Sequence, residues 1–98
     1  MDLSDTLRYI MNQLKEDIIE SEHFLRRCRE RGFDPRRIRS TMTESRILGI
    51  LEQGENLYKL WYHLSKEKDL NIVVKITKEG RIKIVIVFPC NIDKRERR

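Results

Sequence analysis

A histidine and two arginines recur at four-residue intervals between Glu22 and Gly32, as His23, Arg27 and Arg31. If this segment is helical, the three side chains lie one turn apart on a single face. A neutral imidazole beside two guanidinium groups can accept a proton next to a bound phosphate, which metal-free RNA cleavage requires. The alternative is an exposed basic face of a surface helix that has no chemistry.

In metal-free RNA cleavage the 2′-hydroxyl attacks the phosphorus atom, an acid protonates the leaving 5′-oxygen, and cations stabilise the phosphate oxygens. Arg27 and Arg31 would disfavour protonation of His23 and keep it able to accept a proton. Their planar guanidinium groups also match two phosphate oxygens at once. The sequence has no cluster of carboxylates with metal-ligand spacing, so we expect neither a metal nor a cofactor.

A second proton-transfer group is expected on the segment that follows Leu57. Alternation along a strand places His63 with Lys59 and Trp61 on one face, and Tyr58 and Tyr62 on the other. A nucleic-acid base could stack on Trp61 within such a patch. The alternatives are a core tryptophan with a satisfied N–H group, a solvated histidine and two core tyrosines.

The charge of the chain is unevenly distributed. The formal net charge is +5, but the first 22 residues carry two basic and six acidic side chains, so the remainder has a net charge of +9. A basic body favours a polyanionic partner, and we expect RNA, although a merely soluble basic protein is the alternative. The other residues predicted to contact nucleic acid are all cationic: Arg26, Arg36, Arg37, Lys75, Arg81 and Lys83, with Arg39 extending the same surface.

Composition also limits the location and class of the protein. At 98 residues the chain is one small domain. It has no signal peptide and no apolar run of membrane-spanning length, so we expect a cytoplasmic protein without a membrane partner. Cys28 and Cys90 are far apart and lack the paired spacing of a zinc site.

Helices are predicted in the first half of the chain. Apolar periodicity predicts an amphipathic helix over residues 4–19 with an acidic outer face, which either covers the core or pairs with a second copy to make a homodimer. A second helix over 22–31 should end at Gly32, and a third should begin with Asp34 as cap and Pro35 in the first turn.

Strands are predicted in the second half, at residues 47–52, 57–64, 72–76 and 82–88, the last ended by a proline. A tight hairpin at Gly80 joins the last two strands. The order of elements predicts an α+β fold with N-terminal helices on one face of a four-stranded antiparallel meander.

These features together resemble RelE-like toxin folds of the barnase, colicin and RelE type. The nearest resemblance is to a domain of unknown function whose helix carries the pattern His-x-x-x-Arg-x-x-x-Arg-Gly, here His23 to Gly32. The segment Glu79–Val85 is similar to the glycine and basic residue that precede the final apolar strand of that group. The resemblance covers residues 22–90, which leaves 1–21 as an additional helix and 91–98 as a charged tail.

The resemblance implies a metal-independent endoribonuclease of toxin type, neutralised by an antitoxin protein. His23 would then be the acid–base residue, and Arg27 and Arg31 would hold the phosphate. Relatives carry a polar residue late in the final strand, where this chain has Val87-Phe88-Pro89. Two alternatives therefore stay open: a nucleic-acid-binding module without catalysis, and a protein-interaction domain that dimerises through its first helix.

Overall fold

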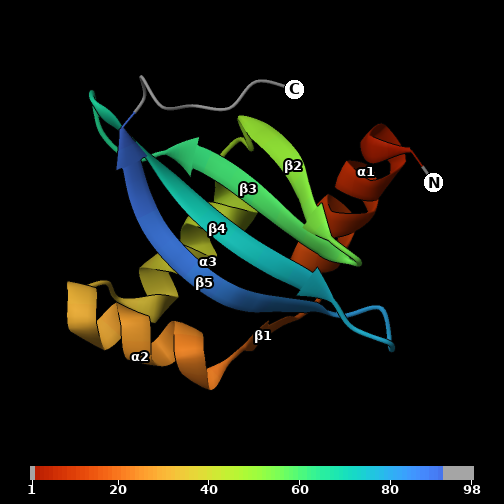
Figure 1. Cartoon of the computed structure of the whole chain (residues 1–98), viewed down its shortest axis with the longest axis horizontal. Coiled ribbons are helices and arrows are strands. Elements are labelled where there is room, and N and C mark those ends of the chain that lie inside the picture. The colour runs from red at the N-terminus through yellow and green to blue at the C-terminus, as the bar shows by residue number, and fades with distance from the viewer. Residues whose placement is uncertain (1, 92–98) are drawn as a thin grey trace.

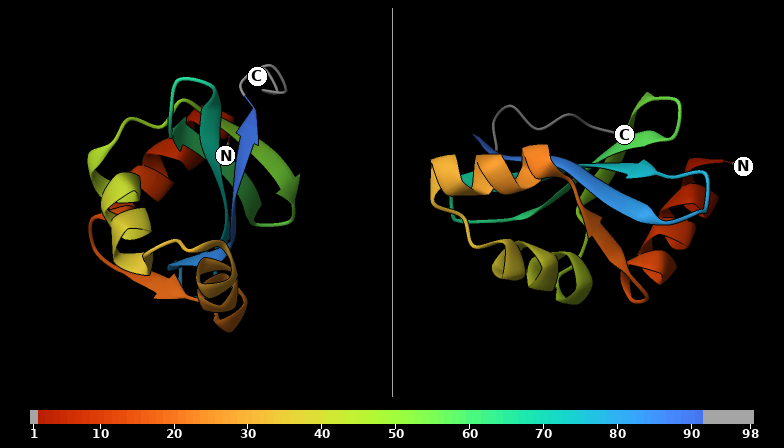
Figure 2. Two further views of the ribbon diagram at one scale, coloured as in Figure 1. Left: turned by 90° about the vertical axis from the view of Figure 1, so that its left-hand side faces the viewer. Right: turned by 90° about the horizontal axis from the view of Figure 1, so that it is seen from below.

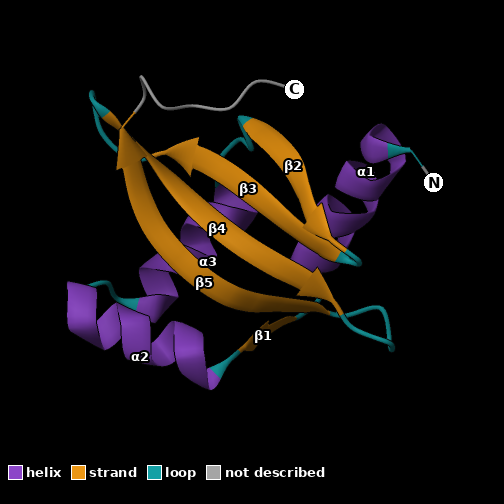
Figure 3. Cartoon of the chain, viewed as in Figure 1, coloured by secondary structure: helices purple, strands orange, loops and turns teal. Residues whose placement is uncertain are grey.

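The computed structural model describes residues 2–91, which form three helices and five strands (Figures 1 and 3). This confirms the α+β class. The elements in chain order are α1 Leu3–Leu14, β1 Ile18–Glu20, α2 Glu22–Arg31, α3 Pro35–Glu44, β2 Gly49–Gly54, β3 Leu57–His63, β4 Lys68–Ile76 and β5 Ile82–Asn91.

Local signals determine the helix ends. The side chains of Asp2, Ser21 and Asp34 each accept a backbone N–H in the first turn of α1, α2 and α3, which satisfies donors that have no partner inside the helix. Gly32 ends α2 in the left-handed conformation, with φ of 73°. The predicted limits of the second helix, and the Asp34-Pro35 start of the third, are confirmed.

The first helix is shorter than predicted, because it ends at Leu14 and residues 18–20 form β1 instead. Strand β1 pairs in parallel with β5, with Ile18 opposite Ile82 and Glu20 opposite Ile84. The β-branched isoleucines favour a strand, and this pairing satisfies part of the open edge of β5. The sheet therefore has five strands in the order β1-β5-β4-β3-β2 and is mixed, which corrects the prediction of a four-stranded antiparallel sheet.

Strands β2 to β5 do form the predicted antiparallel meander, with shifted limits. Strand β4 starts at Lys68, within the predicted loop, and β5 continues past Pro89 to Asn91. Proline is tolerated where no neighbouring strand needs its N–H group, and β1 pairs only with residues 82–84 of β5. A strand at this sheet edge can therefore contain the proline that was expected to end it.

The core lies on one face of a curved sheet. Helices α1 and α3 cover this face, and α2 runs beside β5 after β1 (Figures 1 and 2). Alternate residues of β3, Tyr58, Leu60 and Tyr62, are buried in the core, which agrees with the alternative of two core tyrosines rather than a proton-transfer role. Burial raises the pKa of the Tyr62 hydroxyl, which donates a hydrogen bond to the carbonyl of Met42 at 3.4 Å.

The first 21 residues are integrated into this core. Ile10 and Leu14 of α1 are buried, and the Tyr9 hydroxyl donates a 2.6 Å hydrogen bond to the carbonyl of Gly80 in the last hairpin. At the other end of the chain, most of the predicted charged tail lies outside the described residues. Among residues 2–91 we find no helix long and apolar enough to cross a membrane.

Candidate nucleic-acid interface

His23, Arg27 and Arg31 all lie on α2, as predicted from their spacing. His23 is exposed, and its Nδ1 lies 3.0 Å from a guanidinium nitrogen of Arg26. Arg27 is about two-thirds buried, with 34% of its side chain exposed, and forms an ion pair with Glu30 at 3.6 Å. Arg31 is exposed in the last turn. The three side chains share a face, but only His23 and Arg31 are open to a ligand.

The contact with Arg26 determines which nitrogen of His23 carries hydrogen. A guanidinium group only donates hydrogen bonds, so Nδ1 accepts and the neutral ring carries its hydrogen on Nε2. In this arrangement His23 and Arg26 both present N–H donors, which suits binding a phosphate oxygen. Proton acceptance by Nδ1 would first require Arg26 to move away.

The second predicted histidine is distant from the first. His63 of β3 lies opposite Asp69 of β4, which lies opposite Cys90 of β5. His23 follows two residues after Ser21, whose hydroxyl donates a hydrogen bond to the carbonyl of Val85 on β5. Five residues of β5 separate those levels, about 16 Å at the rise of an extended strand. The structure therefore does not bring His23 and His63 to one phosphate.

The tryptophan next to His63 is not an open stacking surface. Trp61 is 4% exposed, and its ring lies over the Cα of Gly49 on β2, where a Cβ would overlap it. Lys59, on the same face of β3, is half-buried. Because a base stacks only on an accessible ring, Trp61 acts here as a packing residue.

The remaining predicted cations lie on the sheet and its last hairpin. Lys75 of β4 is opposite Lys83 of β5, so the two share one row across the strands. Arg81 forms an ion pair with Asp17, which follows α1. These three cations are therefore grouped near the β4–β5 hairpin, and one of them is already paired.

A second and larger group of cations lies on α2 and α3. The two helices are joined by a three-residue turn, Gly32–Asp34, and run in different directions (Figure 2). Six exposed arginines on them form what we call the arginine surface: Arg26, Arg29, Arg31, Arg36, Arg37 and Arg39. Arg36 is paired with Asp34 and Arg39 with Glu20, each at 3.7 Å. Within residues 2–91, no ion pair forms at Arg29, Arg31 or Arg37.

One member of this surface, Arg29, was not among the residues predicted from the sequence to bind nucleic acid. The sequence signal for Arg29 is the use of arginine rather than lysine in this part of the chain. Residues 22–46 contain eight arginines and no lysine, and residues 47–80 contain five lysines and no arginine. Such segregation indicates a surface that needs the guanidinium group rather than positive charge alone.

In a comparison with known protein families, residues 4–74 match the sequence model of the MJ0788 family. The chain belongs to the MJ0788 family. The part of this MJ0788 family member that matches runs from α1 into β4 and contains the whole arginine surface. No curated protein and no solved structure matches the chain.

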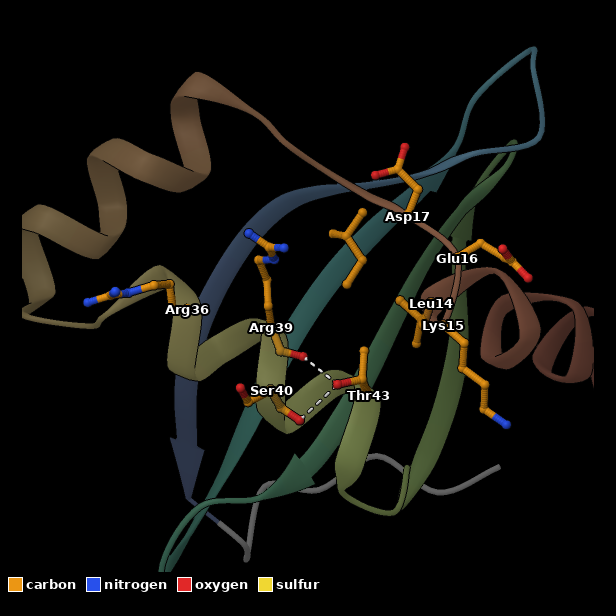
Figure 4. Close-up of a pocket in the computed structure, with 9 residues that line it drawn as sticks. Leu14, Lys15, Glu16, Asp17, Arg36, Arg39, Ser40 and Thr43 are labelled. Atoms are coloured by element: carbon orange, nitrogen blue, oxygen red, sulfur yellow. Dashed lines mark hydrogen bonds between the residues drawn. The ribbon is translucent and has the colours of Figure 1, made fainter.

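A groove of about 470 Å³ lies beside the arginine surface, between α3 and the connection from α1 to β1 (Figure 4). Arg36 and Arg39 belong to both features. Two apolar residues, Leu14 and Ile18, also line the groove. The remaining lining residues are polar or charged: Lys15, Glu16, Asp17, Ser40 and Thr43. This groove was not predictable from the sequence, because its two walls are about 20 residues apart in the chain.

Proposed function

We propose that this member of the MJ0788 family binds nucleic acid, with RNA as the expected ligand, through the arginine surface of α2 and α3. The observation that carries the proposal is the presence of six exposed arginines on two consecutive helices, three of which have a side chain with neither an ion pair nor a hydrogen bond within residues 2–91. Unpaired, exposed guanidinium groups can bind phosphate without first breaking a contact in the protein.

Physical chemistry predicts how such binding behaves. Each arginine that neutralises a phosphate releases condensed counterions, so affinity falls as salt concentration rises. With three phosphate contacts the logarithm of the binding constant falls with the logarithm of salt concentration at a slope of about −2 to −3. His23 adds an N–H donor beside Arg26, but no charge when neutral.

The proposal is tested by fluorescence anisotropy with a labelled RNA hairpin at several salt concentrations. We expect Arg31→Glu/Arg37→Glu to weaken binding at least about tenfold and to flatten the salt dependence, since it removes two cations and adds two anions. The matched control is Lys66→Glu/Lys68→Glu, which makes the same charge change at two exposed residues, one in the β3–β4 turn and one at the start of β4. Equal losses in both variants would contradict a role for the arginine surface.

Ribonuclease activity of the RelE-like toxin type, with an antitoxin as partner, stays a prediction. It is tested on the same samples by following RNA fragments in excess EDTA. Fragments with 2′,3′-cyclic phosphate ends that disappear in His23→Ala would support it. Equal cleavage by the wild type and His23→Ala would exclude His23 as the base.

Dimerisation through the first helix also stays a prediction. Ile10 and Leu14 of that helix are buried within the chain itself, and Leu3 and Leu7 pack against the core. Met11, at 46% exposed, is the large apolar residue of α1 most open to a partner. A second copy would therefore find little apolar surface on α1.

A further inference from the structure

We propose that the groove between α3 and the α1–β1 connection holds one unpaired nucleotide of the bound RNA. This inference rests on the proposed function, and it specifies which form of RNA the protein prefers. The groove is continuous with the arginine surface because Arg36 and Arg39 line both. A strand held on α2 and α3 can therefore place a neighbouring nucleotide in the groove.

The dimensions suit one nucleotide. Arg36, Ser40 and Thr43 lie along one stripe of α3, and seven residues of helix span about 10 Å. The volume of about 470 Å³ is in the range of sites that take small ligands. A paired base is held inside its duplex and cannot enter a groove of this size, whereas an unpaired base can turn outward.

The chemistry of the α3 wall suits a sugar and phosphate. Arg36 and Arg39 are each paired with one carboxylate at 3.7 Å, and the remaining donors of their guanidinium groups are available for phosphate oxygens. The Ser40 hydroxyl makes no hydrogen bond within residues 2–91, so it can donate or accept. The Thr43 hydroxyl donates to the carbonyls of Arg39 and Ser40, both at 3.2 Å, and its oxygen can still accept.

The opposite wall suits a base. Leu14 and Ile18 give an apolar surface for the face of a ring. The two acidic residues do not oppose a phosphate at the α3 wall: Asp17 is paired with Arg81, and the side chain of Glu16 is turned away from α3 (Figure 4).

The test compares a blunt RNA duplex with the same duplex carrying one bulged adenosine. For the wild type we expect the bulged RNA to bind at least about fivefold more tightly, which corresponds to about 1 kcal/mol. Thr43→Trp fills the groove and should abolish this preference while the blunt duplex binds within about twofold of wild type. Thr43→Ser keeps the groove open and should retain the preference. Ser40→Trp is a second filling variant in case Thr43→Trp does not fold.

The outcomes separate the two proposals. Failure of both RNAs to bind at low salt would overturn the proposed function and this inference together. Equal binding of both RNAs by the wild type would overturn only the inference. A preference that persists in both filled variants would also overturn it, because the unpaired nucleotide would then bind elsewhere.

Discussion

Arginine is the only cation between residues 22 and 46, and lysine is the only cation between residues 47 and 80. The first region forms α2 and α3, and the second forms β2, β3 and β4. The two regions also differ in burial. The arginine region is mostly exposed outside a narrow apolar stripe, whereas Leu60, Tyr62, Leu70 and Ile72 of the strands are almost fully buried.

This difference separates binding from stability. Arginine carries a planar, weakly hydrated group that binds phosphate with two hydrogen bonds, whereas lysine is a strongly hydrated point charge. We infer that α2 and α3 provide the binding surface and that the sheet provides most of the folding free energy.

The largest expected effect tests the sheet. Gly49→Ala would place a methyl group in the space occupied by the buried Trp61 ring, and should lower the free energy of unfolding by about 2–3 kcal/mol in urea titrations. The control is Gly54→Ala, whose added Cβ meets only Leu57 at 3.9 Å and should cost less than about 1 kcal/mol. Equal unfolding midpoints would contradict tight packing between β2 and β3.

A charge-conserving exchange tests the arginine surface. Arg31→Lys/Arg37→Lys keeps both positive charges but loses the paired donors, and should weaken RNA binding about three- to fivefold without changing stability. The reverse exchange, Lys66→Arg/Lys68→Arg, should leave affinity within about twofold of wild type. If the lysine variant binds as well as wild type, positive charge alone accounts for binding, and the separation of arginines from lysines along the chain has no role in it.

An effect of similar size concerns pH and the buried hydroxyl of Tyr62. Burial raises the pKa of this hydroxyl, so above about pH 10 the unfolded chain releases the proton while the folded chain retains it. Stability should therefore fall as pH rises, by about 0.8 kcal/mol more at pH 10.5 than at pH 8 for this group. Tyr62→Phe should lack that part of the decrease. If the free energy of unfolding falls equally in the wild type and in Tyr62→Phe between pH 8 and pH 10.5, the Tyr62 hydroxyl is not the cause.

Features set by neighbouring residues were predictable. The limits of α2, the Asp34-Pro35 start of α3 and the positive φ of Gly80 follow from local chemistry. Strand β1 was not predictable in this way, because Ile18 continues the apolar period of α1 and becomes a strand only by pairing with Ile82. Long-range pairing overrides local periodicity there.

The candidate site was predictable in part for the same reason. Helical spacing placed His23, Arg27 and Arg31 on one face, but it did not indicate that the Arg27 side chain would be about two-thirds buried. Alternation placed Trp61 on the face opposite the core tyrosines, yet not over Gly49, because that contact depends on strand register. The groove forms because the end of α1 lies beside α3, and this long-range contact cannot be predicted from a local sequence pattern.

The parallel pairing of β1 with β5 has a consequence for the order of events during synthesis. The Ser21 cap of α2 bonds to Val85, 64 residues further along the chain. We expect so long a loop to close late in folding, because the chain loses conformational entropy before the stabilising contacts form. The arginine helices are thus anchored only after β5 has been made. A nascent chain therefore completes the proposed RNA-binding surface only after residues 82–91 have left the ribosome.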